Sequence, residues 1–223
     1  MSMKNAKVSI QVVQKTPAYK NPKLPSAKRA QDLLKRMTLE EKAAQMLCIW
    51  QQKAETLVDA NGNFDLQKAK KAFHDRRGLG QVGRPSDAGG GKGARAMAEL
   101  TNDIQRFFLE NSRLGIPVIF HEECLHGHAA PEGTSFPQPI ALGATFNPEL
   151  VERLFTMTAL EARSRGAHHA LTRWSMWLAN PVGGALKKPT AKIPTLCRGS
   201  ELPRSAGSRA IATSVTNATC WLR

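Results

Sequence analysis

The residues best suited to chemistry lie in one stretch, where apolar residues run directly into acids, a cysteine and histidines. Residues 117–127 read PVIFHEECLHG, and the apolar run Val118 to Phe120 has the composition of a short buried strand. Polar side chains at the carboxyl end of such a strand are what a β/α barrel uses to build an active site. Three chemistries are open to this stretch: metal binding, nucleophilic catalysis and ligand binding by a carboxylate.

The spacing argues against the first two of these chemistries. A zincin motif needs a second histidine four residues after His121, but that position is Leu125 and His126 comes one residue later. The four cysteines form no C-x-x-C pair, so neither a zinc site nor a disulfide framework is predicted. Cys124 lacks the signature of an activated nucleophile, and we interpret it as a partly buried structural thiol. We therefore predict no metal site and no cofactor.

Glu122 and Glu123 are the remaining candidates in the stretch. Successive residues of a strand point to opposite faces, so only one of the two can face a pocket. An ionised carboxylate accepts up to about four hydrogen bonds, which suits the hydroxyl groups of a sugar. The residues alone fit an acid in a surface loop equally well.

The segments around this stretch predict alternating helices and strands, which is the pattern of an α/β protein. A capping box at Thr38 and Glu41 starts one helix, and Asn147 followed by Pro148 starts another. The glycine-rich run at 87–93 is predicted to be a flexible loop, and its spacing is wrong for a phosphate-binding loop. The helices are expected at residues 26–37, 38–47, 65–74, 94–112 and 147–165, with strands at 78–83, at 118–120 and close to 172.

The charge of the chain raises a competing hypothesis. Its 223 residues carry a formal net charge of +14, which suggests a basic nucleic-acid-binding or interaction protein. Half of the excess lies from Arg173 onward, where eight basic residues face one acid. No nucleic-acid-binding module or set of base-stacking aromatic residues is visible, so we predict no nucleic-acid partner.

The targeting features of the chain are weak. No apolar run approaches the roughly 18 residues that a membrane span needs, so we predict no membrane association. The N-terminal residues have lysines but no apolar core, so we see no signal peptide and expect a cytoplasmic location for the sequence as written.

Six segments together resemble the N-terminal domain of glycoside hydrolase family 3, which contains β-glucosidases and β-xylosidases. The resemblance is ordered and continuous from about Tyr19 to Thr172, and its ECLHG form is similar to the β-xylosidase branch. It implies that Glu123 binds the sugar in the glycone subsite, with Leu125 and His126 as neighbours in that pocket. The matching segments are residues 20–25, 36–46, 114–117, 123–127, 134–138 and 143–147.

The resemblance stops abruptly after Thr172. The family would continue with PVVDVARDPRWGR, but the chain has RWSMWLANPV. When the codons are read one base earlier, Met176 and Trp177 must give valine, because both residues have a single codon. With third bases chosen freely, residues 172–210 then decode as PVVDVAREPRWGRVEETYGEDP and onward in the manner of the family. We infer a one-base loss near the codon for Thr172, and an intact frame in the gene would contradict this.

The resemblance implies a parent enzyme with a (β/α)8 TIM-type barrel followed by an α/β sandwich domain. It would remove terminal β-linked xylose or glucose from oligosaccharides or glycosides by a retaining mechanism, which uses two carboxyl groups about 5–5.5 Å apart. The family's nucleophile lies late in the barrel and its acid/base in the next domain, so we expect no catalytic residue here. In the family, export to the periplasm or medium is frequent.

The expected organisation follows from this comparison. Residues 1–18 would be a disordered leader, 19–172 the N-terminal part of the barrel, and 173–223 an out-of-frame, disordered tail. Such a fragment of a barrel has an open strand edge and unburied apolar faces, so we expect an unstable, aggregation-prone product without activity. An intact small hydrolase that uses His121, Glu122 and Cys124 is a further alternative.

Overall fold

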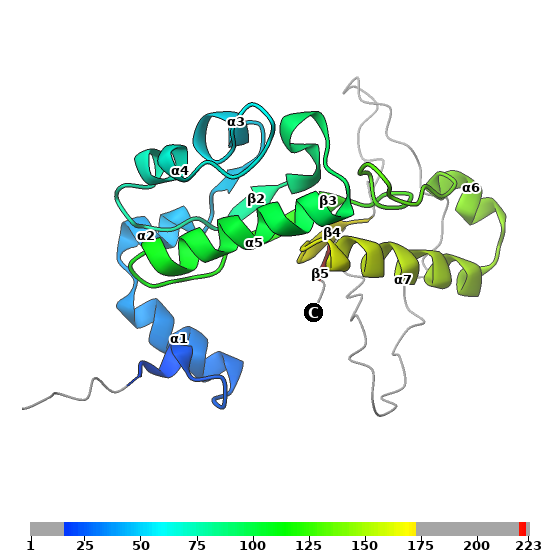
Figure 1. Cartoon of the computed structure of the whole chain (residues 1–223). Coiled ribbons are helices and arrows are strands. Elements are labelled where there is room, and N and C mark those ends of the chain that lie inside the picture. The colour runs from blue at the N-terminus through cyan, green and yellow to red at the C-terminus, as the bar shows by residue number, and fades with distance from the viewer. Residues whose placement is uncertain (1–15, 173–218, 222–223) are drawn as a thin grey trace, which may run out of the picture. The chain divides into compact units, whose positions relative to one another are not determined.

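The computed structural model describes residues 16–172 and 219–221, and the chain divides into two compact units, Met1–Lys42 and Ala43–Arg223 (Figure 1). Most of the expected leader and tail therefore lies outside the described residues. The exception in the tail is a three-residue strand, β5 (Thr219–Trp221).

The first unit is a short helical arm. The backbone N–H of Tyr19 donates to Asp32 Oδ2 at 3.0 Å, and Arg29 Nε donates to the Tyr19 carbonyl at 2.9 Å. The predicted capping box is confirmed, because Thr38 N donates to Glu41 Oε2 at 2.9 Å and Glu41 N donates to Thr38 Oγ1 at 3.2 Å. The elements are η1 (Ala18–Lys20), α1 (Ser26–Arg36) and the beginning of α2 (Leu39–Ala44).

The predicted extension of the second helix through residue 47 is wrong, since α2 ends at Ala44. The backbone there pairs with the next strand instead: the Ala44 carbonyl accepts from Gly80 N and the Leu47 carbonyl accepts from Gln81 N, both at 3.0 Å. Leu47 is consequently 60% exposed rather than buried on a helix face. Strand pairing at long range has overridden a locally helical pattern.

The second unit is built on a five-stranded sheet in the order β1-β2-β3-β4-β5. The first four strands are parallel and neighbours in sequence, and β5 pairs antiparallel with β4. Parallel strands that follow one another in sequence order are typical of a β/α barrel, whereas a doubly wound sheet reverses its order. The strands are β1 (Cys48–Ile49), β2 (Gln81–Gly83), β3 (Ile119–Glu123) and β4 (His169–Leu171).

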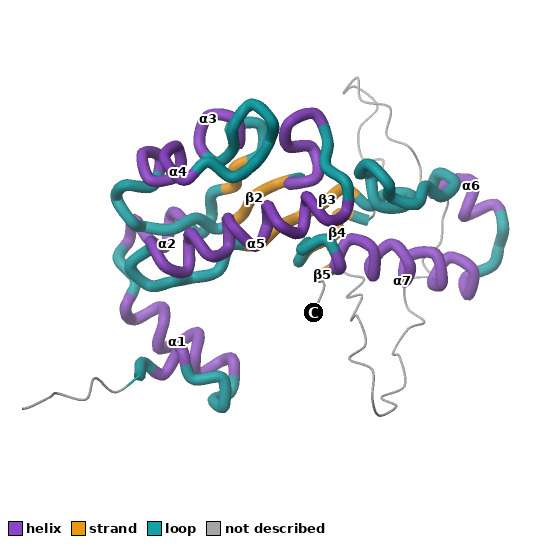
Figure 2. Tube along the Cα trace, viewed as in Figure 1, coloured by secondary structure: helices purple, strands orange, loops and turns teal. Residues whose placement is uncertain are grey.

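Helical segments connect each parallel strand to the next, so the expected α/β class with part of a TIM-type barrel is confirmed (Figure 2). Asn147 caps α7 as predicted, with its Oδ1 accepting from Leu150 N at 3.0 Å. The connecting segments are α3 (Lys53–Thr56), α4 (Leu66–Ala72), η2 (Pro85–Gly90), α5 (Ala94–Asn111), α6 (Pro139–Ala144) and α7 (Pro148–Ser164).

One face of the sheet carries the hydrophobic core. Val82 of β2 and Phe120 of β3 pack in one buried cluster with side chains of α5, and Ala170 of β4 packs in a second with side chains of α7. The periodicity of α5 predicted its buried side correctly: Met97, Leu100, Ile104, Phe107 and Phe108 are all buried. We call the opposite face of the sheet, to which the side chains of His121 and Glu123 point, the inner face.

The glycine-rich run is not the flexible loop that its composition predicts. It forms η2 and an ordered turn, in which Ser86 and Lys92 are buried. Lys92 Nζ donates to the carbonyl of Asn61 at 3.3 Å and to Asn63 Oδ1 at 3.2 Å. These partners come from a loop about thirty residues earlier, which composition alone does not reveal.

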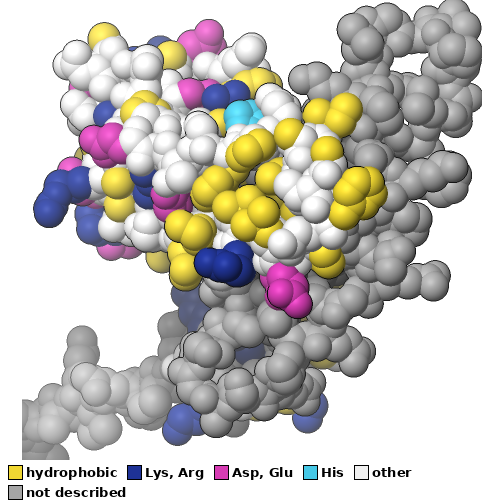
Figure 3. Space-filling model, turned by 90° about the vertical axis from the view of Figure 1, so that its right-hand side faces the viewer, with side chains coloured by type: hydrophobic (Ala, Val, Ile, Leu, Met, Phe, Trp, Pro, Cys, Tyr) yellow, Lys and Arg dark blue, Asp and Glu magenta, His cyan; other side chains and the backbone are white. Residues whose placement is uncertain are grey.

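Apolar side chains gather on the surface formed by α6, α7 and the turn between them (Figure 3). A patch of this kind marks a surface that normally packs against something else. Its members are Ile140 (60% exposed), Phe146 (90%), Met157 (52%) and Leu160 (58%). Within the described part of the chain, no helix is both long and apolar enough to cross a membrane.

Candidate functional site

The candidate site lies where the parallel strands end. Trp50 follows β1, Arg84 and Asp87 follow β2, and Glu123 ends β3. The Arg84 N–H donates to the His121 carbonyl at 2.8 Å, which holds the turn after β2 against β3. The carboxyl ends of parallel strands meet at one edge of the sheet, so these side chains gather there.

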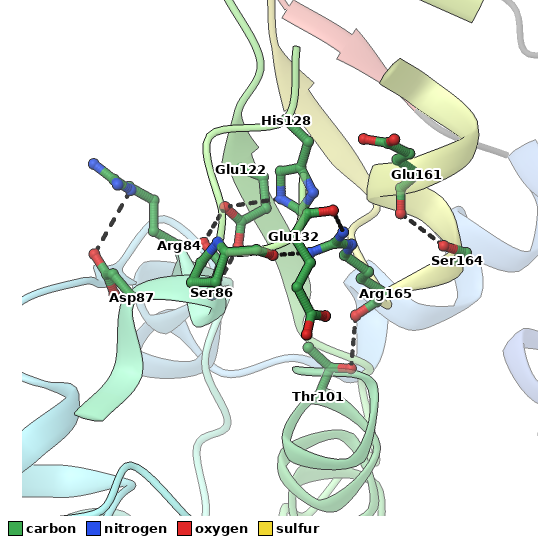
Figure 4. Close-up of polar contacts among 12 residues, drawn as sticks. Arg84, Ser86, Asp87, Thr101, Glu122, His128, Glu132, Glu161, Ser164 and Arg165 are labelled. Carbon is green, nitrogen blue, oxygen red and sulfur yellow. Dashed lines mark hydrogen bonds and ion pairs between the residues drawn. The ribbon is translucent and has the colours of Figure 1, made fainter. Parts of the chain in front are cut away.

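Glu122 points away from the inner face and is completely buried. Its Oε1 accepts from Ser86 N at 2.9 Å, and its Oε2 accepts from Ser86 Oγ at 2.7 Å (Figure 4). His128 Nε2 lies 3.4 Å from the same Oε2, and its side chain is also fully buried. The Glu122 carboxylate thus joins the turns after β2 and β3, and its burial leaves no surface for a substrate.

Glu123 lies on the inner face, at the end of β3 beside Leu171 of β4. It is half-buried, and no hydrogen bond or ion pair of its carboxylate is found among the described residues. Leu125 and His126 follow in the turn and are half-buried as well. The structure therefore assigns opposite faces to the two acids, while the sugar-binding role of Glu123 and its neighbours stays a prediction.

The turn after Glu123 depends on Gly127. Its φ of +103° is a backbone conformation that side chains other than hydrogen strongly disfavour. A Cβ built at this position would also collide with the carbonyl oxygen of Thr134. The glycine of the ECLHG motif is therefore required by the backbone.

Hydrogen bonds hold the loop that follows this turn on two sides, and Figure 4 shows the contact between Arg165 and Glu132. The guanidinium of buried Arg165 donates to the Glu132 carbonyl at 2.8 Å, and the Glu132 carboxylate accepts from Ala94 N at the start of α5 at 3.0 Å. Glu161 of α7 accepts from Thr134 N at 3.0 Å. These contacts fix the position of the turn that carries Glu123.

A cluster that the sequence did not reveal surrounds Asp87. Lys53 Nζ lies 2.9 Å from Asp87 Oδ1, and Trp50 Nε1 donates to Asp87 Oδ2 at 2.9 Å. Arg84 Nε lies 3.6 Å from Oδ2, and its guanidinium stacks 5.7 Å from the Trp50 ring. Burial lowers the pKa of Lys53, and the hydrogen bond to Asp87 opposes that shift. The sequence signal that could have revealed this cluster is the run RPSD, which comes directly after the predicted strand at 78–83. Residues that follow a parallel strand lie at the same edge of the sheet as Glu123.

Cys124 is completely buried with Met97, Ala162 and Ala170, so the predicted burial of its thiol is confirmed and is complete rather than partial. This burial removes the exposed setting that a nucleophilic thiol needs. Within residues 16–172 and 219–221, no three His, Cys, Asp or Glu side chains lie close enough to share a metal ion.

Three histidines, which lie in or next to β3 and β4, predict that the stability of the folded chain depends on pH. Burial is the main cause that lowers the pKa of His121, His168 and His169, so the folded chain binds fewer protons there than the unfolded chain. Their contribution to stability is full above the unfolded pKa of about 6.5 and declines as the pH falls. We expect proteolytic cleavage of the native chain to accelerate from pH 7.5 to pH 5.5, after correction with an unfolded substrate.

A matched pair of variants controls this experiment. His169→Gln should flatten the pH profile, because it removes one of the depressed groups. His74→Gln, at an exposed position, should leave the profile unchanged. A cleavage rate independent of pH in the unsubstituted chain would contradict the prediction.

Comparison with known proteins shows which family this chain resembles. Residues 38–172 match the glycosyl hydrolase family 3 N-terminal domain. The chain is 37% identical over 151 residues to a protein of Formosa agariphila assigned as a β-xylosidase, with 67% of this chain and 19% of that protein covered. It is 32% identical over 162 residues to a periplasmic β-glucosidase/β-xylosidase of Dickeya chrysanthemi, with 69% and 24% covered.

The solved structures agree with the sequence comparison. A β-glucosidase from Erythrobacter marinus superposes with a TM-score of 0.56 at 32% identity, covering 70% of this chain and 20% of that one. The chain thus spans about a fifth to a quarter of the length of these relatives. Because the family match extends over more than half of the 223 residues, from β1 to β4, the chain belongs to glycosyl hydrolase family 3 through its N-terminal domain.

Proposed function

We propose that residues 19–172 form the N-terminal part of the barrel of a retaining β-xylosidase or β-glucosidase, and that Glu123 binds the sugar. The observation that carries this proposal is that two adjacent acids point to opposite faces of the sheet. Glu122 is buried and hydrogen-bonded to Ser86, whereas Glu123 lies on the inner face at the carboxyl end of β3. In a β/α barrel, that end of a strand faces the substrate.

We further propose that the chain as printed binds sugar without hydrolysing it. A retaining glycosidase needs a nucleophile and an acid/base, and the resemblance supplies neither within residues 19–172. The family match ends at Thr172, where the sequence departs from the family pattern. A reading frame shifted by one base would resume that pattern if the third bases of the codons are chosen to suit it. Sequencing the gene across the codons for Leu171 to Trp174 tests the inferred base loss.

Binding and hydrolysis can be measured separately on the purified chain. We expect no release of the aryl group from an aryl β-xyloside, and weak binding of methyl β-xyloside in saturation transfer difference NMR. Glu123→Gln should weaken that binding at least about tenfold, since hydrogen bonds to a charged group contribute about 1.5–3 kcal/mol.

Glu99→Gln is the matched control, because Glu99 is an exposed acid on α5, away from the strand ends. Equal binding by the Glu123→Gln and unsubstituted chains would contradict the assigned role of Glu123. Hydrolysis that survives Glu123→Gln but not substitution of Cys124 or His121 would favour the alternative of an intact small hydrolase.

A further inference from the structure

A row of residues on the inner face crosses the sheet at the level of His121, two residues before Glu123 on β3. His121 is paired with Gly83 of β2 and with His169 of β4, and Trp50 follows β1 in the same register. Residues at the same level of parallel strands point to the same face, and His121 and Glu123 are two positions apart on β3. The row and the Glu123 carboxylate therefore share one face.

Gly83 makes room for the side chains on either side of it. A Cβ built at Gly83 would lie 2.7 Å from His121 Nε2 and 3.3 Å from Trp50 Cβ. The imidazole of His121 and the Cβ of Trp50 consequently approach the Gly83 backbone from the two neighbouring strands. The indole is 42% exposed, and its Nε1 is already held by Asp87.

The hydrogen bonding of His121 determines which ring nitrogen can accept a hydrogen bond. Nδ1 lies 3.2 Å from Gln81 Oε1, an acceptor, so Nδ1 carries the hydrogen and Nε2 carries the free lone pair. Burial lowers the pKa of His121, which favours the neutral form of the ring. No hydrogen-bond partner of Nε2 is found among the residues that the structure describes. Nε2 is therefore an acceptor on the inner face.

We propose that His121 is a second sugar-binding residue, whose Nε2 accepts a hydrogen bond from one hydroxyl of the sugar held by Glu123. This inference rests on the proposed sugar site and adds a residue to it. The ligand class is a neutral pyranose with adjacent hydroxyl groups, because both side chains act as acceptors. The exposed indole of Trp50 lies beside this position and presents an apolar surface to the C–H groups of the ring.

The test combines variants of His121 with sugars that lack single hydroxyl groups. His121→Phe keeps an aromatic ring without a nitrogen, and His121→Gln restores an acceptor. Methyl β-xyloside and its 2-, 3- and 4-deoxy forms serve as ligands in saturation transfer difference NMR. We expect His121→Phe to weaken binding of the parent sugar about three- to tenfold, as the loss of one neutral hydrogen bond predicts, with partial recovery in His121→Gln.

The deoxy sugars distinguish a contact from an indirect effect. To the unsubstituted chain, one deoxy form should bind less tightly than the parent sugar. To His121→Phe, that deoxy form and the parent sugar should bind with equal affinity, because the missing hydroxyl group and the missing Nε2 are the two partners of one hydrogen bond. Uniform weakening of all four sugars by His121→Phe would overturn the contact. Full binding by His121→Phe with loss in Glu123→Gln would overturn this inference alone, whereas no binding by the unsubstituted chain would overturn the sugar site as well.

Discussion

Glu122→Leu should lower the free energy of unfolding of the described domain by on the order of 2–4 kcal/mol. Leucine is similar in volume but leaves the N–H and hydroxyl of Ser86 without their acceptor in a buried place, and it removes the carboxylate oxygen that lies 3.4 Å from His128 Nε2. An unsatisfied buried polar group costs about 1–3 kcal/mol. The effect is measured as the urea dependence of proteolytic cleavage, which reports the population of open chains.

The neighbouring acid supplies the matched control. Glu123→Leu makes the same substitution one residue later, on the opposite face and without a hydrogen-bonded partner among the described residues. It should change stability by no more than about 0.5 kcal/mol and should abolish sugar binding. Ser86→Ala should fall between the two, since it removes one hydroxyl and keeps the backbone N–H. Equal destabilisation by the two leucine variants would contradict the division of labour between the acids.

Gly127→Ala should destabilise the domain by at least about 3 kcal/mol, because it combines backbone strain with a steric clash. The residue has a φ of +103°, and its new Cβ would collide with the Thr134 carbonyl, which is part of the backbone and cannot rotate away. The turn after β3 must then open, so binding of methyl β-xyloside should be lost as well. Cleavage in urea and saturation transfer measure the two effects.

Gly90→Ala separates the strain from the clash. Gly90 also has a positive φ, +88°, but a Cβ there would meet no atom within 4 Å. We expect a loss of only about 1–2 kcal/mol from the disfavoured backbone conformation. If the two alanine variants were equally destabilised, the contact between Gly127 and Thr134 would not be the reason for the glycine in the ECLHG motif.

Local features of this protein could be predicted from the sequence because their partners lie within a few residues. The capping box of Thr38 and Glu41, the Asn147 cap and the buried side of α5 each depend on one turn or one helix. The strand at 118–120 could be recognised as well, because an apolar run between turn signals is typical of a buried strand. The ordered set of family segments supplied the barrel, which local patterns do not specify.

The stretch with the acids and histidines was thus located by the sequence, but the residues alone left open which of the two acids faces a pocket. Only the tertiary structure decided which acid is structural, because the Ser86 partner of Glu122 comes from 36 residues earlier in the chain. The same holds for the end of α2 at Ala44 and for the cluster around Asp87. Pairing of distant strands and burial of charged groups depend on the whole sheet, and no local pattern of residues encodes them.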